Sequence, residues 1–241
     1  MKYRSSIILP DLPAAYPMST DSVLLSRFVT LRKGDRVCDL GAGIGTLSML
    51  LSECHPDCEF VGFELQEEAV RVSSDVIREN GFSNISVHSL DLRDLTALRT
   101  QGLFDAAVSN PPYFAAESGA LSQNQGRAAS RSEESLPLSS LCAAAEKLLK
   151  FGGDFFLVHK PERLADLCCA LREYRLEPKI LRFVKNQKDS IPSLLLLSCR
   201  KGGKAGLSCR EDLILRNEDG SPSDEYMQIY GIGGELSCPE A

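Results

Sequence analysis

Apolar runs alternate with amphipathic segments along most of the chain, and this alternation constrains the fold more than any other feature. Strands that alternate with helices imply a parallel sheet with right-handed crossovers and helices on both of its faces. The sequence predicts an α/β fold with strands over residues 36–40, 59–64, 85–89, 104–109, 154–159, 179–184 and 193–200. It predicts helices over residues 20–31, 46–53, 67–80, 138–150 and 162–174.

The length and composition are typical of one globular enzyme-sized domain. The 241 residues suffice for a sizeable core, so we expect a single domain with a helical cap over 1–34, a core over 35–200 and an extension over 201–241. No apolar run reaches the roughly 18 residues that a membrane span needs, and the N-terminal run is too short for a secretory signal. We therefore expect a cytoplasmic protein without membrane partners. The nine cysteines show no metal-ligand spacing, which predicts reduced thiols and no bound metal.

Residues 37–45, Val-Cys-Asp-Leu-Gly-Ala-Gly-Ile-Gly, predict a strand that runs into a glycine turn before a helix. Gly41, Gly43 and Gly45 let the backbone approach a ligand closely and adopt positive φ. The turn is one residue shorter than the dinucleotide motif Gly-x-Gly-x-x-Gly. Asp39 offers a carboxylate that can hold the ammonium of a methionine moiety and would repel a pyrophosphate. The turn therefore favours S-adenosyl-L-methionine as the cofactor over a nicotinamide dinucleotide.

Two more acids follow at the ends of the next two predicted strands. Glu64 can accept hydrogen bonds from both ribose hydroxyls of such a cofactor. Asp91 can accept from the adenine amino group, with Leu65 and Leu92 beside the ring. Any one of these acids is more often a loop-facing charge or a helix cap. Three acids at the carboxyl ends of successive strands indicate a site, since open α/β sheets bind ligands at that edge.

The tetrapeptide Asn110-Pro111-Pro112-Tyr113 follows the fourth predicted strand. An amino group conjugated to an adenine ring is a poor nucleophile, because its lone pair is delocalised. The Asn110 side chain and the Pro111 carbonyl supply two acceptors that favour a more pyramidal nitrogen, and Tyr113 can stack on the ring. Such chemistry needs positioning and electrostatics more than a dedicated base. We therefore predict Asn110, Pro111 and Tyr113 as catalytic residues, with Asn110 also beside the cofactor.

A basic segment and a long loop are the candidate nucleic-acid contacts. Residues 172–216 hold 11 Lys or Arg and 5 Asp or Glu, a net charge of +6 in a chain whose total is −6. This is either a polyanion footprint or a solvated face. The loop over 114–135 has no periodicity, as is typical of a lid or a disordered segment. The predicted substrate contacts are Pro112, Phe114, Arg127, Arg131, Lys185 and Lys188.

These motifs resemble the Rossmann-like, S-adenosylmethionine-dependent amino-methyltransferases that carry an Asn-Pro-Pro-Tyr motif. Residues 20–28, 152–164 and 176–179 are also similar to the tRNA1(Val) adenine-37 N6-methyltransferase family. The resemblance implies a class I methyltransferase fold, with seven mostly parallel strands in the order 3-2-1-4-5-7-6. It also implies tRNA as the substrate and the N6 amine of adenine as the target. One departure is visible, because residues 131–133 read Arg-Ser-Glu where the family often has Arg-His-Glu.

Three other functions remain open on the sequence alone. A glutamine-amide methyltransferase of release factors would use the same tetrapeptide. Enzymes of that group are longer and have an N-terminal recognition domain, whereas only 35 residues precede the first predicted strand here and the basic segment is C-terminal. A small-molecule methyltransferase is a second alternative. A catalytically silent RNA-binding or cofactor-sensing protein is a third. It would be expected to lack Asn110 or one of the acids, and none of them is missing. The oligomeric state is not encoded in any pattern, and a monomer is slightly favoured.

Overall fold

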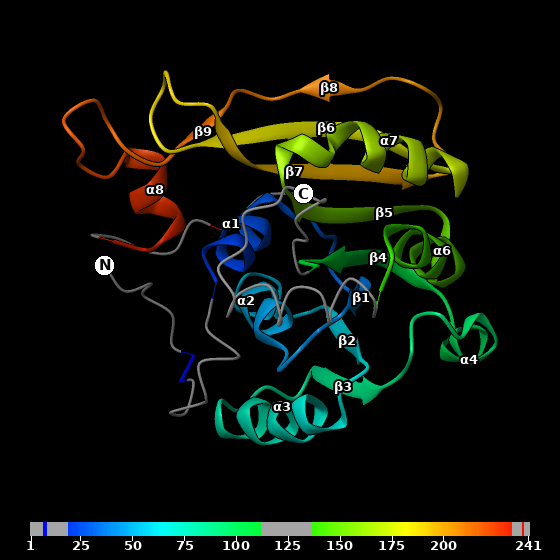
Figure 1. The fold of residues 1–241 in the computed structure, drawn as a ribbon. Helices are drawn as coiled ribbons and strands as arrows, with labels where there is room; N and C mark the ends of the chain where they lie inside the picture. The colour runs from blue at the N-terminus through cyan, green and yellow to red at the C-terminus, as the bar shows by residue number, and fades with distance from the viewer. Residues whose placement is uncertain (1–6, 9–18, 112–135, 233–237, 239–241) are drawn as a thin grey trace, which may run out of the picture.

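The computed structural model describes residues 7–8, 19–111, 136–232 and 238. One sheet runs through this part of the chain (Figure 1), with its main path in the order β3-β2-β1-β4-β5-β7-β6-β8. The predicted order of seven strands is confirmed, and β7 is the antiparallel one. Two short strands, β8 and β9, both pair with β6 and extend the sheet. The strands are β1 Arg36–Leu40, β2 Glu59–Glu64, β3 Ile85–Ser89, β4 Phe104–Ser109, β5 Leu149–His159, β6 Leu176–Lys185, β7 Pro192–Lys201, β8 Ser208–Cys209 and β9 Leu213–Ile214.

Helices cover both faces of the sheet, as the alternation predicts. Each face has its own apolar cluster of buried side chains. One cluster joins the sheet to α1 Thr20–Phe28, α2 Thr46–Cys54, α3 Glu67–Glu79 and α8 Asp224–Ile229. The other joins it to α4 Leu95–Leu98, α6 Leu138–Leu148 and α7 Leu164–Glu173. Short 3-10 turns, η1 Arg99–Gln101 and η2 Pro161–Arg163, complete the described elements.

Two predicted helix ends are wrong. The helix expected over 20–31 ends at Phe28, where Val29 turns to extended backbone angles, yet Val29 and Leu31 are both buried. These two apolar side chains are thus buried in the core although the helix does not extend to them. The helix expected over 138–150 ends at Leu148, and β5 begins at the next residue. Residues 150–153, which read as a glycine helix exit, belong to this strand, because Leu149 pairs with Phe104.

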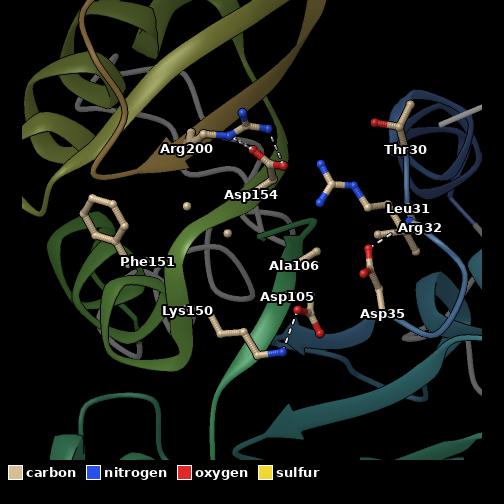
Figure 2. Close-up of a pocket in the computed structure, with 12 residues that line it drawn as sticks. Thr30, Leu31, Arg32, Asp35, Asp105, Ala106, Lys150, Phe151, Asp154 and Arg200 are labelled. Atoms are coloured by element: carbon tan, nitrogen blue, oxygen red, sulfur yellow. Dashed lines mark hydrogen bonds and ion pairs between the residues drawn. The ribbon is translucent and has the colours of Figure 1, made fainter.

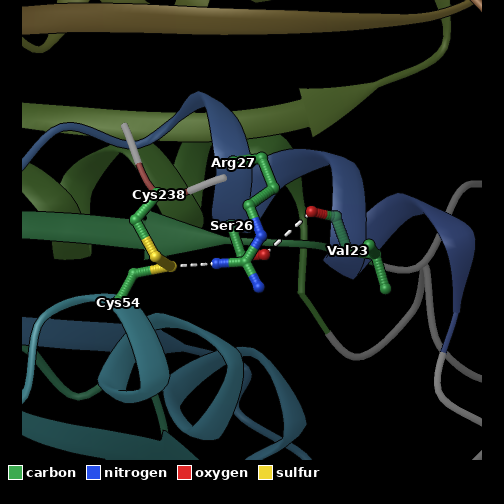
Figure 3. Close-up of a disulfide and its surroundings, with 5 residues drawn as sticks. All are labelled: Val23, Ser26, Arg27, Cys54 and Cys238. Carbon is green, nitrogen blue, oxygen red and sulfur yellow. Dashed lines mark hydrogen bonds between the residues drawn. A yellow bond between two sulfur atoms is a disulfide. The ribbon is translucent and has the colours of Figure 1, made fainter. Parts of the chain in front are cut away.

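The cysteines divide into one disulfide and seven free thiols. Cys54, at the end of α2, is bonded to Cys238 near the C-terminus, with 5.3 Å between their Cα atoms (Figure 3). The expectation of reduced thiols is wrong for this pair. Arg27 of α1 donates a hydrogen bond to Cys54 Sγ. Burial raises the pKa of the Cys38 and Cys199 thiols, which act as small apolar core residues, as expected.

Within the described residues, no helix is both long and apolar enough to cross a membrane. The same residues contain no group of three or more His, Cys, Asp or Glu side chains that could hold a metal ion.

Candidate active site

The glycine turn lies at the carboxyl edge of the sheet, where β1 and β4 end side by side. Asp39 is paired in register with both Gly62 of β2 and Val108 of β4. The backbone N–H groups of Gly41 and Ala42 donate to the Phe63 carbonyl, at 2.9 and 3.1 Å. These bonds fold the turn back over the end of β2.

Gly62, which the sequence analysis did not single out, allows this close approach. A Cβ atom at position 62 would lie 2.7 Å from the Ala42 Cβ and 3.0 Å from a Val87 methyl carbon. Gly41 and Gly43 have positive φ angles of 79° and 55°. A Cβ built on either would meet no atom within 4 Å, so this side of the turn is open to a ligand.

A cavity of about 220 Å³ lies between this turn, α1 and the residue that follows β4. It brings together four of the predicted site residues, Asp39, Gly41, Gly43 and Asn110. It also brings in α1 and α2, which the sequence analysis did not place at the site. The complete lining is Ser19, Ser22, Asp39, Gly41, Ala42, Gly43, Ile44, Thr46, Leu47 and Asn110.

Asp39 is a buried carboxylate in the wall of this cavity. Its side chain accepts a 2.8 Å hydrogen bond from the Ser48 hydroxyl, and the residue is only 2% exposed. Burial raises the Asp39 pKa to about 7, with a smaller contribution from the Glu64 charge, while the Ser48 hydrogen bond acts to lower it. No basic side chain in the described part of the chain forms an ion pair with it. A cationic ligand in the cavity would supply that missing partner.

Glu64 ends β2 and is fixed to the turn. Its two carboxylate oxygens accept from the backbone N–H groups of Gly43 and Gln66, each at 2.9 Å. A carboxylate can accept several hydrogen bonds, so these two contacts leave acceptor capacity for ligand hydroxyls. Leu65 beside it is 45% exposed and can cover a flat ring.

Asp91 and Leu92 lie near the end of β2, but they do not line the cavity to which they were predicted to contribute. The segment that contains them lies beside β2, because Leu90 N donates to the Glu64 carbonyl at 2.9 Å. The Asp91 carboxylate, however, is in an ion pair with the Arg93 guanidinium at 2.7 Å, which holds the pKa of Asp91 below its usual range. Leu92 is 5% exposed and packs in a core cluster. Neither residue lines the cavity.

Asn110 sits at the opposite wall of the cavity, directly after β4. Its side-chain amide nitrogen donates to the hydroxyls of Ser22 and Ser19, at 2.9 and 3.2 Å. Pro111 is half-buried. The other predicted residues of this region lie outside the described part of the chain: Pro112, Tyr113, Phe114, Arg127 and Arg131.

The basic segment 172–216 is divided between the two edges of the sheet. Lys185 and Lys188 lie at the turn between β6 and β7, which is the edge that carries the cavity. Lys185 is in an ion pair with Asp212 at 2.8 Å, while Lys188 is exposed. Arg175 precedes β6 and Lys204 follows β7, so both lie at the other edge. The net charge of +6 is therefore not one continuous face.

A larger crevice of about 370 Å³ opens at that other edge (Figure 2). Its acidic groups are already engaged. Lys150 pairs with Asp105 at 2.6 Å and Arg200 with Asp154 at 2.9 Å, while Asp35 accepts from the backbone N–H of Arg32 at 2.8 Å. The two ion pairs connect β5 to β4 and to β7, at the edge where β4 and β5 begin and β7 ends. We therefore assign the crevice a structural role and place the functional site at the carboxyl edge.

The chain matches the model of a methyltransferase domain over residues 31–195. It is 34% identical over 217 residues to the tRNA1(Val) (adenine(37)-N6)-methyltransferase of Serratia proteamaculans, a match that covers 89% of this chain and 82% of that protein. It is 28% identical over 224 residues to the enzyme of the same name from Shewanella sp. strain MR-4, with 92% and 93% covered.

Two solved structures are similar in fold. A predicted O-methyltransferase from Agrobacterium tumefaciens superposes with a TM-score of 0.74 at 18% identity, over 92% of this chain and all of that one. TrmN from Thermus thermophilus superposes with a TM-score of 0.55 at 21% identity, over 75% of this chain and 48% of that one. At these identities the superpositions show that the fold is shared.

Proposed function

Because the chain belongs to the methyltransferase-domain family, and within it to the tRNA1(Val) (adenine(37)-N6)-methyltransferases, we propose that it methylates the exocyclic N6 amine of an adenine in tRNA. S-adenosyl-L-methionine is the methyl donor of this family. The observation that carries the proposal is one cavity that joins a buried carboxylate on an open glycine turn to the amide of Asn110.

The residues of the turn fit this cofactor. The buried Asp39 carboxylate has no cationic partner among the described residues and suits an ammonium group. Gly41 and Gly43 leave room for a ligand to approach the backbone. We propose that Gly45 serves the same turn by starting α2 from a positive φ of 82°.

We propose that Glu64 accepts from the ribose hydroxyls and that Leu65 covers the adenine ring. Asp91 already forms an ion pair with Arg93. To bind the adenine amino group as well, the Asp91 carboxylate would accept a hydrogen bond from that group while it keeps its contact with Arg93. Leu92 would support this segment from the core rather than touch the ring.

When bound, S-adenosyl-L-methionine supplies an electrophilic methyl group. The task of the protein is to hold the adenine amine in line with that group and to favour a localised lone pair. We propose that the Asn110 side-chain oxygen and the Pro111 carbonyl accept the two amine hydrogens, while Tyr113 stacks on the base. With the amine held in this way, its lone pair would attack the methyl carbon as the bond from that carbon to sulfur breaks, with S-adenosylhomocysteine as the leaving group. The methylated nitrogen would then release one proton to water, so no buried base is required.

We propose that tRNA approaches along the carboxyl edge, where Lys188 is exposed and Lys185 lies close by. Arg127 and Arg131 of segment 114–135, with Pro112 of the Asn-Pro-Pro-Tyr motif and Phe114 directly after it, would complete the contact. A base in a loop leaves its stack at lower cost than a paired base, so an anticodon-loop adenine is a suitable target.

We further propose that residues 1–241 act as one methyltransferase domain in the cytoplasm, where tRNA is found, and that the protein acts as a monomer. The function is tested by mass spectrometry of tRNA nucleosides from cells with and without this protein. Loss of N6-methyladenosine from one tRNA would support the proposal. An unchanged nucleoside profile, together with loss of methylated glutamine in a release factor, would refute it.

A further inference from the structure

We propose that Ser22 and Ser19 are positioning residues for methyl transfer, which hold the Asn110 amide with its oxygen directed toward the target amine. The inference rests on the proposed function, because it assigns Asn110 Oδ1 as an acceptor for that amine. Neither serine belongs to the glycine turn or to the Asn-Pro-Pro-Tyr motif. They lie at the start of α1, 88 and 91 residues before Asn110 in the sequence.

The amide nitrogen of Asn110 has two hydrogens, and the structure gives each an acceptor. One goes to Ser22 Oγ at 2.9 Å and the other to Ser19 Oγ at 3.2 Å. Ser22 is 7% exposed and Ser19 is half-buried, and both line the cavity. Water therefore competes weakly for these bonds, which strengthens them.

A side-chain amide can turn over and exchange its oxygen with its nitrogen. The reversed orientation would point two N–H donors at an amine that itself donates, and it would lose the acceptor that the reaction needs. Some feature must therefore fix the direction of the hydrogen bonds between Asn110 and the serines.

The helix end provides this direction. Ser19 is the N-cap of α1, and its Oγ accepts from the backbone N–H of Ser22 at 3.1 Å. A backbone N–H can only donate, so one lone pair of Ser19 Oγ is committed. The Ser19 hydroxyl then donates to Ser22 Oγ at 3.1 Å. In this arrangement both hydroxyl oxygens accept from Asn110. An inverted amide would present Oδ1 to both hydroxyls, so the Ser19 hydroxyl would either leave Ser22 Oγ to donate to Oδ1 or face Oδ1 with a lone pair. In each case one bond of this chain is lost.

The same helix contains a matched control. Ser26 lies one turn after Ser22 and is fully buried. Its hydroxyl donates to the Val23 carbonyl at 2.8 Å (Figure 3), a bond that stays within α1. Ser26→Ala therefore removes a buried hydroxyl from α1 without touching Asn110, and it reports the purely structural cost of such a change.

The first experiment measures the amide directly and needs no activity. In ¹⁵N-labelled protein, the Asn110 side-chain NH₂ resonances are identified by their absence in Asn110→Ala. We expect Ser22→Ala to shift these resonances and to speed their exchange with water, and we expect Ser26→Ala to leave them in place. Unchanged resonances in Ser22→Ala would overturn the proposal even if the protein methylates tRNA.

The second experiment measures single-turnover methylation of unmodified tRNA at saturating cofactor. We expect Ser22→Ala to lower the rate by about 5- to 30-fold, as for loss of one hydrogen bond that orients a reacting group. Cofactor affinity and the melting temperature should match those of Ser26→Ala. Ser22→Thr, which keeps the hydroxyl, should recover most of the rate.

A double mutant separates positioning from an independent effect. If Ser22 acts through Asn110, adding Ser22→Ala to Asn110→Ala should change the remaining rate by less than about twofold. A full additional loss in the double mutant would overturn the proposal. A wild-type protein that methylates no tRNA would refute the proposed function instead, and the resonances of the amide would still decide how Asn110 is held.

Discussion

The Asp39 carboxylate accepts a 2.8 Å hydrogen bond from the Ser48 hydroxyl, and both side chains are buried. This bond ties β1 to α2 directly behind the glycine turn. It leaves a carboxylate in the cavity wall without a cation beside it in the described part of the chain. Such a group costs stability and is retained where a ligand compensates it.

Asp39→Asn should stabilise the cofactor-free protein at pH 8. The folded-state pKa of about 7 lies above the ordinary value of 3.8, so the folded protein binds more protons between these values. Stability therefore falls as the pH rises from about 4 to 7, and the penalty is fully present above pH 7. Removing the charge should raise the free energy of unfolding by about 1–3 kcal/mol in urea titrations at pH 8, and by little at pH 4. Equal effects at both pH values would contradict this account.

Cofactor affinity should depend on the same ionisation. Between pH 5.5 and 7 the amino group of the cofactor stays protonated, since its pKa is about 8. Below pH 7 most Asp39 carboxyls are protonated, and each must lose its proton before it can pair with the ammonium of the cofactor. Cofactor affinity should therefore fall by up to about tenfold for each pH unit below 7. Calorimetry should show this slope in the wild type and in Asp75→Asn, an exposed site on α3, but not in Asp39→Asn. A flat profile in the wild type would exclude Asp39 as the group that holds the ammonium.

Gly62→Ala should open the glycine turn. Its new Cβ would lie 2.7 Å from the Ala42 Cβ, and the surrounding strands leave little room to adjust. We expect a loss of about 1–3 kcal/mol in unfolding free energy and weaker cofactor binding. Adding Ala42→Gly removes the nearest clashing atom and should restore part of both. The interpretation fails if the single variant is as stable as the wild type.

Charge reversal should show which of the two edges of the sheet contributes to tRNA binding. Lys185→Glu with Lys188→Glu changes the edge of the cavity and should weaken tRNA binding, with a shallower dependence on salt because fewer phosphates are neutralised. Arg175→Glu with Lys204→Glu makes the same change in charge at the opposite edge and should have a much smaller effect. Filter-binding titrations at several salt concentrations measure both. Equal losses in the two double variants would favour a general charge effect over a docking surface.

The Cys54–Cys238 disulfide should be detectable by thiol titration of the protein in solution. Without reductant, the denatured protein should react with seven equivalents of a thiol reagent, and with nine after reduction, as the seven free cysteines and one disulfide require. Cys238→Ser should lower the free energy of unfolding by about 2–5 kcal/mol without reductant and by little in its presence. Nine reactive thiols without reductant would show that the two cysteines are not bonded.

The strands were predictable because most of them are short apolar runs between amphipathic segments, as in β1, β2, β4 and β7. The order of the strands was implied by the family resemblance. Local spacing also indicated the glycine turn, Glu64 and Asn110. It failed at Leu149, where pairing with Phe104 extends a strand into residues that read as a helix exit. Long-range pairing outweighed the local glycine signal there.

The cavity wall formed by α1 could not be predicted from local patterns. Ser19 is the N-cap of α1, but nothing near it in the sequence indicates contact with a residue 91 positions away. Asp91 shows the reverse limitation. The spacing at strand ends identified the acid, but it did not reveal that Arg93 occupies the carboxylate.

Methylation of the adenine N6 amine in tRNA is tested most directly by a single-turnover reaction of the purified protein with unmodified tRNA. The S-adenosylmethionine carries an isotopically labelled methyl group, and mass spectrometry of the nucleosides detects the product. We expect labelled N6-methyladenosine with the wild type, and a rate at least about 100-fold lower with Asn110→Ala, a loss far larger than its loss of cofactor affinity. Labelled N6-methyladenosine formed by Asn110→Ala at the wild-type rate, or no label in any nucleoside with the wild type, would contradict this expectation.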